Sequence, residues 1–165
     1  MKRLLLHCCC APCASYVLDL LREQFDITVL FYNPNIIPNE ERDRRRAELM
    51  KLVKLMNKEG KNCVEVINYK GEKVLLEKRD CEECFMHRLG VTWFMAEEGK
   101  FDYFATTLTV SPHKNASMVN EIGEAFSPKY YVSDFKKKDG FRKSVELSQK
   151  YGLYRQNYCG CEPKE

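Results

Sequence analysis

Two short apolar runs near the beginning of the chain restrict the fold most strongly. Residues 2–7 contain Leu4, Leu5 and Leu6, and residues 27–32 read Ile-Thr-Val-Leu-Phe-Tyr. A strand that is apolar on both faces is typical of the middle of a parallel sheet covered by helices on both sides. The amphipathic stretch at 14–25 supplies the crossover helix that two parallel strands need. We therefore predict a β-α-β unit at the start of the chain.

The same alternation continues to the end of the chain. Further strands are expected at 62–68, 101–106 and 129–133, and helices at about 39–60, 81–98, 115–126 and 141–151. Five strands alternating with helices predict a doubly wound α/β fold with a mainly parallel five-stranded sheet. The length suits a single domain over 1–165, within which the C-terminal tail, 152–165, is expected to fold back to the rim that carries the other cysteines.

Nine cysteines are present, although a chain of 165 residues can bury a core without disulfide bonds. After Met1-Lys2-Arg3 only three apolar residues precede His7, and no apolar run approaches the roughly 20 residues that span a membrane. We expect a cytoplasmic protein without a membrane partner. In the cytoplasm thiols stay reduced. Cysteine clusters there bind metal or act in catalysis more often than they form structural bridges.

The cysteines fall where strands end. Cys8, Cys9, Cys10 and Cys13 follow the first strand, and four thiols so close together cannot all be bridged to one another without strain. Cys81 and Cys84 begin the helix after the third strand, with Asp80 as its N-cap, and the turn 106–113 follows the fourth strand. Because doubly wound sheets place ligands beyond the carboxyl ends of their strands, these segments predict one site.

The pattern of thiols favours metal over dithiol chemistry alone. A Cys-x-x-Cys pair by itself serves zinc, iron–sulfur clusters and redox dithiols equally well, but here it accompanies Cys9-Cys10 and a terminal Cys-Gly-Cys. A structural zinc knot is the simpler alternative, yet four ligands satisfy zinc and at least seven cysteines crowd this site. Cys8 alternates with Cys9 and is left out, Cys13 is either a further ligand or part of the helix packing, and Cys63 is expected to be a small buried residue in a strand.

Basic residues suggest a surface for RNA but do not prove one. The formal net charge is only +3, so local clustering has to decide. The basic residues are either solvated surface or a patch that binds the phosphates of RNA. The predicted patch comprises Arg44, Arg45, Arg46, Lys114, Lys137 and Arg142. His113 is a weak candidate for a proton donor, because it is a lone histidine in a loop after a strand.

Five motifs together resemble one protein family over essentially the whole chain. They are His-Cys-Cys-Cys-Ala-Pro-Cys at 7–13, Phe-Tyr-Asn-Pro-Asn-Ile at 31–36, Cys-Glu-Glu-Cys-Phe-Met-His-Arg at 81–88, Thr-Thr-Leu-Thr-Val-Ser-Pro-His-Lys at 106–114 and Tyr-Arg-Gln-Asn-Tyr-Cys-Gly-Cys at 154–161. This set is similar to the cobalamin-independent epoxyqueuosine reductases, QueH. The resemblance implies an oxidoreductase with a [4Fe–4S] cluster that removes the epoxide oxygen of epoxyqueuosine in tRNA.

The resemblance also assigns roles to the cysteines. It implies that Cys9, Cys10, Cys81 and Cys84 hold the cluster and that Cys159 and Cys161 are a redox-active pair. It implies a fold similar to adenine-nucleotide α-hydrolases (HUP or Rossmann-like), although the Ser-Gly-Gly-x-Asp-Ser phosphate loop of the ATP-using relatives is absent.

Removing an epoxide oxygen takes two electrons and two protons, whereas a [4Fe–4S] cluster passes single electrons. Cys159 and Cys161 could supply the second redox step as a dithiol, or could join Cys13 as ligands of an additional iron. A donor such as a ferredoxin or flavodoxin would be needed. Two alternatives stay open: a nucleotide-dependent tRNA thiolation enzyme on the same fold, and a zinc-binding or redox-sensing module without catalysis.

Overall fold

Four parallel strands form the sheet, in the order β3-β2-β1-β4. The computed structural model describes residues 1–67, 69, 80–137 and 139–160. Within them β1 covers Arg3–His7, β2 Asp26–Leu30, β3 Glu65–Ile67 and β4 Tyr103–Thr106. β1 pairs with β2 on one side and with β4 on the other. The predicted near-continuous apolar strands are therefore the two central ones, and Leu4, Leu5 and Leu6 are completely buried.

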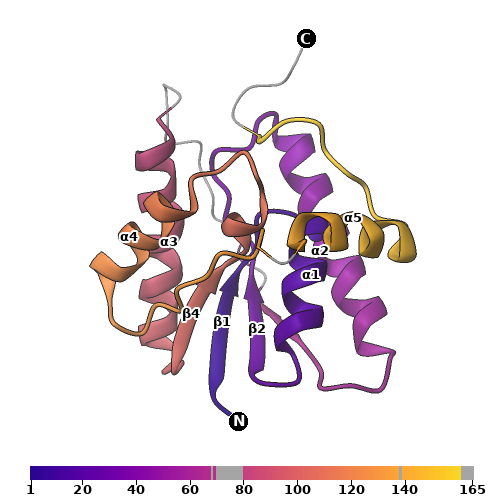
Figure 1. Ribbon diagram of the computed structural model, residues 1–165, viewed down its shortest axis with the longest axis horizontal. Helices are drawn as coiled ribbons and strands as arrows, with labels where there is room; N and C mark the ends of the chain where they lie inside the picture. The colour runs from indigo at the N-terminus through magenta and orange to yellow at the C-terminus, as the bar shows by residue number, and fades with distance from the viewer. Residues whose placement is uncertain (68, 70–79, 138, 161–165) are drawn as a thin grey trace.

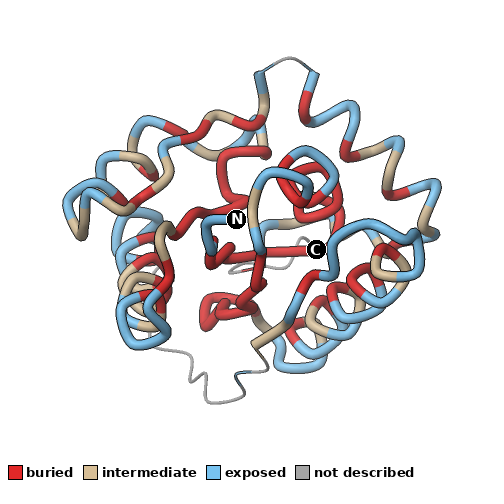
Figure 2. The backbone as a smooth tube through the Cα atoms, turned by 90° about the horizontal axis from the view of Figure 1, so that it is seen from below, coloured by how far each residue is buried: buried red, intermediate tan, exposed pale blue. Residues whose placement is uncertain are grey.

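Helices cover both faces of this sheet, as Figures 1 and 2 show. One face carries α1 (Ala11–Leu21), α2 (Asn39–Asn57) and α5 (Gly140–Tyr151), with α1 packed between the other two. The other face carries α3 (Cys81–Glu98) and α4 (Ala116–Phe126), which pack against each other. The two layers enclose two separate apolar clusters, one on each side of the sheet. None of the described helices is long and apolar enough to cross a bilayer.

The strand predicted at 129–133 is wrong, because the described residues form a sheet of four strands, not five. Only one isolated parallel bridge, between Phe104 and Tyr130, continues the sheet beyond β4. After this bridge the backbone finds other partners: the side chain of Asn120 in α4 bonds to both the N–H and the carbonyl of Ser133. The chain also turns into a 3-10 helix, η1 (Thr107–Val110), directly after β4, so the edge offers no further ladder.

The strand order reverses between β1 and β4. The chain first moves outward from β1 through β2 to β3, and α3 then carries it back across the sheet to β4 on the other side of β1. Such a switch point opens a crevice beyond the carboxyl ends of the two strands, where ligands of doubly wound folds bind. Here β1 ends at His7 and β4 at Thr106, and these two residues are paired in register.

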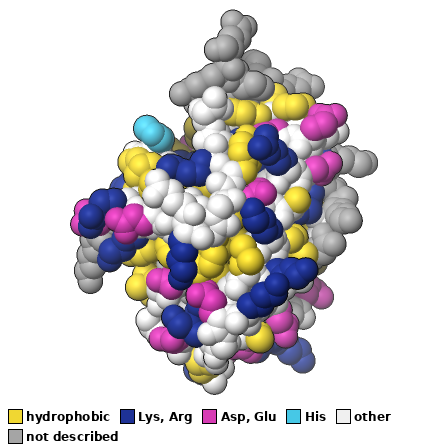
Figure 3. All heavy atoms as spheres, turned by 90° about the vertical axis from the view of Figure 1, so that its right-hand side faces the viewer, with side chains coloured by type: hydrophobic (Ala, Val, Ile, Leu, Met, Phe, Trp, Pro, Cys, Tyr) yellow, Lys and Arg dark blue, Asp and Glu magenta, His cyan; other side chains and the backbone are white. Residues whose placement is uncertain are grey.

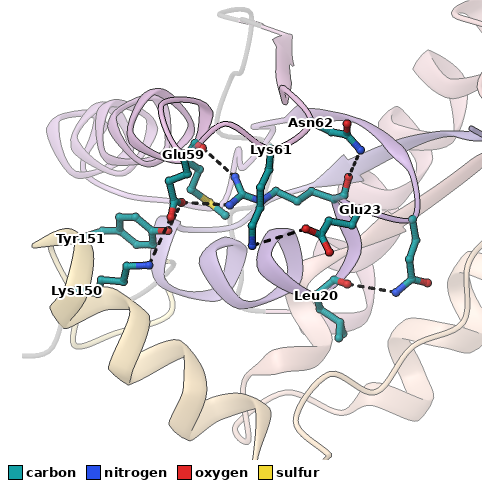
Figure 4. A network of polar contacts seen from close by, with 10 residues as sticks. Leu20, Glu23, Glu59, Lys61, Asn62, Lys150 and Tyr151 are labelled. Atoms are coloured by element: carbon teal, nitrogen blue, oxygen red, sulfur yellow. Dashed lines mark hydrogen bonds and ion pairs between the residues drawn. The ribbon is translucent and has the colours of Figure 1, made fainter.

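A polar network ties the helices of one face together at the opposite end of the sheet. Arg22, just after α1, is almost completely buried, and its guanidinium donates to the carbonyl of Met56 and pairs with Glu59 at 3.2 Å. Figure 4 shows Glu59 also meeting Lys150 and Tyr151 of α5. The buried charge of Arg22 is thus compensated by a carboxylate, and α1, α2 and α5 are joined far from the switch point.

Candidate metal centre

Three thiols meet at the switch point. Cys9 and Cys10 follow β1 directly, Cys10 is the N-cap of α1, and Cys13 lies in the first turn of that helix. The sulfur atoms of these three residues, the thiol trio, all lie within 4.8 Å of one another, and those of Cys9 and Cys10 are 3.9 Å apart. Pro12 is tolerated here because the backbone N–H groups in the first turn of a helix have no acceptor within the helix, so a proline there breaks no hydrogen bond. Every described cysteine is a free thiol.

Cys9 and Cys10 are buried and Cys13 is half-buried, so the charge of the trio is controlled by its neighbours. Hydrogen bonds with the Cys10 and Cys13 thiols hold the pKa of Cys9 well below its usual range, and the nearby charges of Lys114 and Arg88 act in the same direction. Hydrogen bonds to Cys10 and Cys9 raise the pKa of Cys13, and burial adds to this effect. The ionisation of the three thiols is therefore coupled, and negative charge is favoured on Cys9 over Cys13.

The end of β4 completes the surroundings of Cys9. The backbone N–H of Cys9 donates to the hydroxyl oxygen of Thr107 at 3.2 Å, and the sulfur of Cys9 lies 3.4 Å from the same oxygen. Thr107 is completely buried at the start of η1. The predicted convergence of the segment after the first strand with the turn 106–113 is therefore observed, and a hydroxyl group as well as thiols faces the site.

Cys81 and Cys84 begin α3 as the sequence predicts. The carboxylate of Asp80 accepts the backbone N–H of Glu83 at 3.1 Å, which fixes the start of the helix. Cys81 is exposed, whereas Cys84 is 9% exposed and its sulfur accepts a hydrogen bond from Arg88 at 3.5 Å. The structure thus gathers Cys13, which the sequence left open, with Cys9 and Cys10. Cys81 and Cys84 stand on α3, outside the trio.

A buried polar network connects α3 with the trio. Arg88 donates to the side-chain oxygen of Asn33 through two nitrogens, at 3.1 and 2.7 Å, and Asn33 donates to the carbonyl of Cys8. His7 joins at the same oxygen of Asn33, and its Nε2 also faces the carbonyl of Tyr32, so Nε2 carries the proton. Burial, and then the charge of Arg88, lower the pKa of His7 to about 4. His7 is therefore neutral at physiological pH.

Two cysteines lie apart from this site. Cys8 is completely buried in the apolar cluster on the opposite side of the sheet from Cys9, as the alternation of side chains along a strand requires. Burial raises the pKa of the Cys8 thiol well above its usual value. Cys63 was expected inside a strand, but β3 begins only at Glu65 and Cys63 is exposed. The prediction of Cys63 as a buried strand residue was therefore wrong.

The arginines of α2 face the C-terminal tail. Arg45 is 2% exposed, and its guanidinium pairs with Glu41 and donates to the carbonyls of Tyr158 and Cys159 at 3.0 and 3.1 Å. Arg44 lies over the ring of Tyr154 at 3.5 Å. Arg45, which was predicted to bind RNA, is therefore buried against the C-terminal tail, where it holds the chain that carries Cys159.

The described end of this tail reaches the loop after β2. The carbonyl of Gly160 accepts the N–H of Ile37 at 2.8 Å, and the hydroxyl of Tyr158 donates to the carbonyl of Ile37. Gly160 has φ of 125°, and a Cβ there would lie 2.8 Å from a side-chain carbon of Ile36. This close approach requires glycine. Cys161, the second member of the predicted redox pair, lies outside the described residues.

The remaining predicted residues are exposed or half-buried. Arg46 pairs with Asp43 and bonds to the carbonyl of Tyr69, and Arg142 pairs with Asp139 and Glu146. His113 and Lys137 are exposed. Lys114 is half-buried, and its charge acts on Cys9. Figure 3 shows lysine and arginine interspersed with aspartate and glutamate on one side of the molecule, without a uniform basic surface there.

Sequence reasoning did not single out Arg88, Asn33 and Thr107. Each stands inside a quoted motif, but polar residues inside apolar elements are not marked by periodicity. The available signal was spacing: Arg88 follows Cys84 by four residues, which places both on one face of a helix.

Comparison with known proteins identifies the family. The chain matches the family described as epoxyqueuosine reductase QueH over residues 4–163. It is 41% identical to epoxyqueuosine reductase QueH of Streptococcus pyogenes serotype M1, over 96% of this chain and 68% of that protein. It is 36% identical to QueH of Thermotoga maritima, over 98% of this chain and 89% of that protein.

A solved structure shares the fold. The U34-tRNA thiolase NcsA from Methanococcus maripaludis, determined with its [4Fe-4S] cluster, matches with a TM-score of 0.59 and 14% identity. The match covers 93% of this chain and 58% of the thiolase, so this chain spans a little over half of that protein. At this identity the likeness concerns the fold alone, and it confirms the predicted similarity to HUP-like folds. The family match and the identities with its members show that the chain belongs to the QueH family of epoxyqueuosine reductases.

Proposed function

We propose that this protein reduces epoxyqueuosine in tRNA to queuosine at an iron–sulfur cluster held at the switch point. The observation that carries the proposal is the thiol trio: three sulfurs lie within 4.8 Å of one another, two of them on buried cysteines, and the charges of Lys114 and Arg88 act on Cys9. Soft thiolate donors in this number suit iron–sulfur clusters. The family relationship supplies the substrate, because the relatives carry the name epoxyqueuosine reductase.

The residues present fit a [4Fe–4S] cluster. Cys9 and Cys10 come from the turn after β1, and Cys81 and Cys84 from the first turn of α3, where free N–H groups favour thiolates. Four thiolates suffice for such a cluster. Cys13 is then a surplus thiol next to the cluster ligands, and we propose it, with Cys159 and Cys161, as the ligand set of an additional iron.

When bound, the cluster supplies electrons one at a time, and an iron beside it supplies a Lewis acid for the epoxide oxygen. The overall reaction consumes two electrons and two protons, breaks both C–O bonds, forms the alkene and releases water. The protein has to hold the substrate beyond the carboxyl ends of β1 and β4 and to deliver the protons. Lys114 and His113 follow η1 on this edge, and they are the proposed proton donors to the leaving oxygen.

The C-terminal tail supplies the second redox element in this proposal. Its described end lies against the loop 35–37, which follows β2 on the same edge of the sheet as the trio. This role is the alternative to ligating an additional iron: as a free dithiol, Cys159 and Cys161 would give up two electrons by forming a disulfide, which closes a small loop and is easily reduced again. A ferredoxin or flavodoxin is the proposed donor, since each transfers single electrons.

The test is an anaerobic assay of the protein with a reconstituted cluster, tRNA that contains epoxyqueuosine, and a reduced flavodoxin. Mass spectrometry of the nucleosides should show loss of one oxygen atom and formation of queuosine. The matched control is Cys8→Ser, since Cys8 lies on the other side of the sheet and is expected to leave turnover intact. Substrate that stays unreduced by a protein loaded with iron would refute the proposal, and sulfur found in the tRNA would instead indicate a thiolase.

A further inference from the structure

Within the described part of the chain, Arg88 is a buried cation without a carboxylate partner. Its side chain is 2% exposed, and its nitrogens bond to the oxygen of Asn33 and to the sulfur of Cys84. Among the residues that the structure describes, no aspartate or glutamate forms an ion pair with it. The amide of Asn33 is neutral. Burying an uncompensated charge is strongly unfavourable, so an anion is required nearby.

The two other almost completely buried arginines show the usual solution. Arg22 pairs with Glu59 at 3.2 Å and Arg45 pairs with Glu41 at 3.0 Å. Arg88 differs because the groups around it are the sulfur of Cys84, the imidazole of His7, which shares the oxygen of Asn33, and, at longer range, the thiol of Cys9. The only groups near Arg88 that can carry negative charge, within the described chain, are thus the sulfurs of the cysteine site.

We propose that Arg88 is the fixed counter-charge of the cysteine site, and that its guanidinium raises the reduction potential of the cluster held there. The inference rests on the proposed cluster. A cluster with four thiolate ligands is anionic and gains one further negative charge on reduction, so a fixed cation stabilises the reduced form more than the oxidised form. Arg88 is then a positioning residue: it acts on the electron carrier and not on the substrate.

Asn33 gives Arg88 its orientation. The same oxygen of Asn33 accepts from two nitrogens of Arg88 and from His7, and its amide nitrogen is anchored on the carbonyl of Cys8. The two hydrogen bonds from Arg88 to Asn33 orient the guanidinium so that its remaining nitrogen, Nη1, donates to the sulfur of Cys84. A lysine can replace the charge but not the two-pronged contact, which separates electrostatic from geometric effects.

The experiment is a redox titration of the cluster, followed by electron paramagnetic resonance, in the wild-type protein and four variants. Arg88→Gln removes the charge, Arg88→Lys keeps it, and Asn33→Asp places a carboxylate on Arg88 at nearly constant volume. Arg22→Gln is the matched control, because it removes an equally buried arginine at the far end of α1, about 16 Å away along an 11-residue helix.

We expect Arg88→Gln to disfavour the reduced cluster about tenfold at a fixed solution potential, which is a shift of about 59 mV to more negative potential for a one-electron couple. Asn33→Asp should shift the potential in the same direction. Arg88→Lys should show less than half of the shift, and Arg22→Gln none.

Two results would overturn the inference: an unchanged potential in Arg88→Gln, or the same shift in Arg22→Gln. If Arg88→Gln loses the cluster, the iron content of Arg88→Lys distinguishes the two explanations. A cluster that is retained with lysine supports the role of charge, whereas loss of the cluster in both variants would show that Arg88 serves packing and would overturn the inference. A wild-type protein that binds no cluster would instead refute the proposed function.

Discussion

Replacing Arg45 with methionine should release the C-terminal tail without disturbing the cysteine site. The guanidinium of Arg45 donates to the carbonyls of Tyr158 and Cys159 from a position that is 2% exposed. Hydrogen bonds from a charged donor contribute about 1.5–3 kcal/mol each. Because the released carbonyls regain water, the lower end of this range applies to both bonds. The tail should therefore open about a hundredfold more often, which corresponds to about 3 kcal/mol.

Hydrogen exchange measured by mass spectrometry can detect this change. Amides of residues 153–160 should lose about a hundredfold in protection in Arg45→Met, while those of β1 and α3 stay as in the wild-type protein. Turnover should fall with the tail, and iron content should not. The control is Arg44→Met, because Arg44 is exposed and stacks on Tyr154 at 3.5 Å, a contact of about 0.5–1 kcal/mol.

Unchanged protection of residues 153–160 in Arg45→Met would refute this reasoning. The reasoning would also be refuted if Arg45→Met bound tRNA with a weaker salt dependence while residues 153–160 stayed protected. That result would show that Arg45 contacts RNA and does not hold the tail.

Three further outcomes are expected. Serine in place of Cys9, Cys10 or Cys84 should lower the iron and sulfide content while circular dichroism stays that of the folded protein, since the apolar core is built mainly from other residues; full iron content in any of these variants would exclude that residue as a ligand. Serine at both Cys159 and Cys161 should leave about four irons per protein and abolish reduction of epoxyqueuosine, because four thiolates suffice for the cluster; loss of the cluster would make one of the two a ligand. Neutralising Lys114, Lys137 and Arg142 to glutamine should weaken tRNA binding and reduce the slope of log K against log salt by about 0.7–0.9 for each phosphate that the protein no longer neutralises. Lys61→Gln is the control in that titration, because Lys61 pairs with Glu23, just after α1. An equal reduction of the slope in Lys61→Gln would refute the assignment of Lys114, Lys137 and Arg142 to tRNA binding.

Local features of the chain were predictable from the sequence. The near-continuous apolar character of β1 and β2 indicated central parallel strands, and both lie in the middle of the sheet. Asp80 marked the start of α3, because an N-cap acts on amides only a few residues away. The turn after β1 and the turn after β4 could be expected on one edge, since parallel strands end on the same side.

Contacts between distant segments were decided only by the tertiary structure. A pattern in the sequence cannot show whether an arginine faces water or another segment, so Arg45 was predicted to bind RNA although it holds Cys159, 114 residues further along the chain. The stretch 129–133 has the composition of a strand, but its backbone partners come from Asn120 and not from β4. Cys13 joined Cys9 and Cys10 because α1 begins three residues earlier than its apolar pattern indicated, which turns the Cys13 sulfur toward β1. The surroundings of Arg88 were likewise not visible in the sequence. Only the packing of α3 against the sheet removes its guanidinium from water and places it against the sulfur of Cys84.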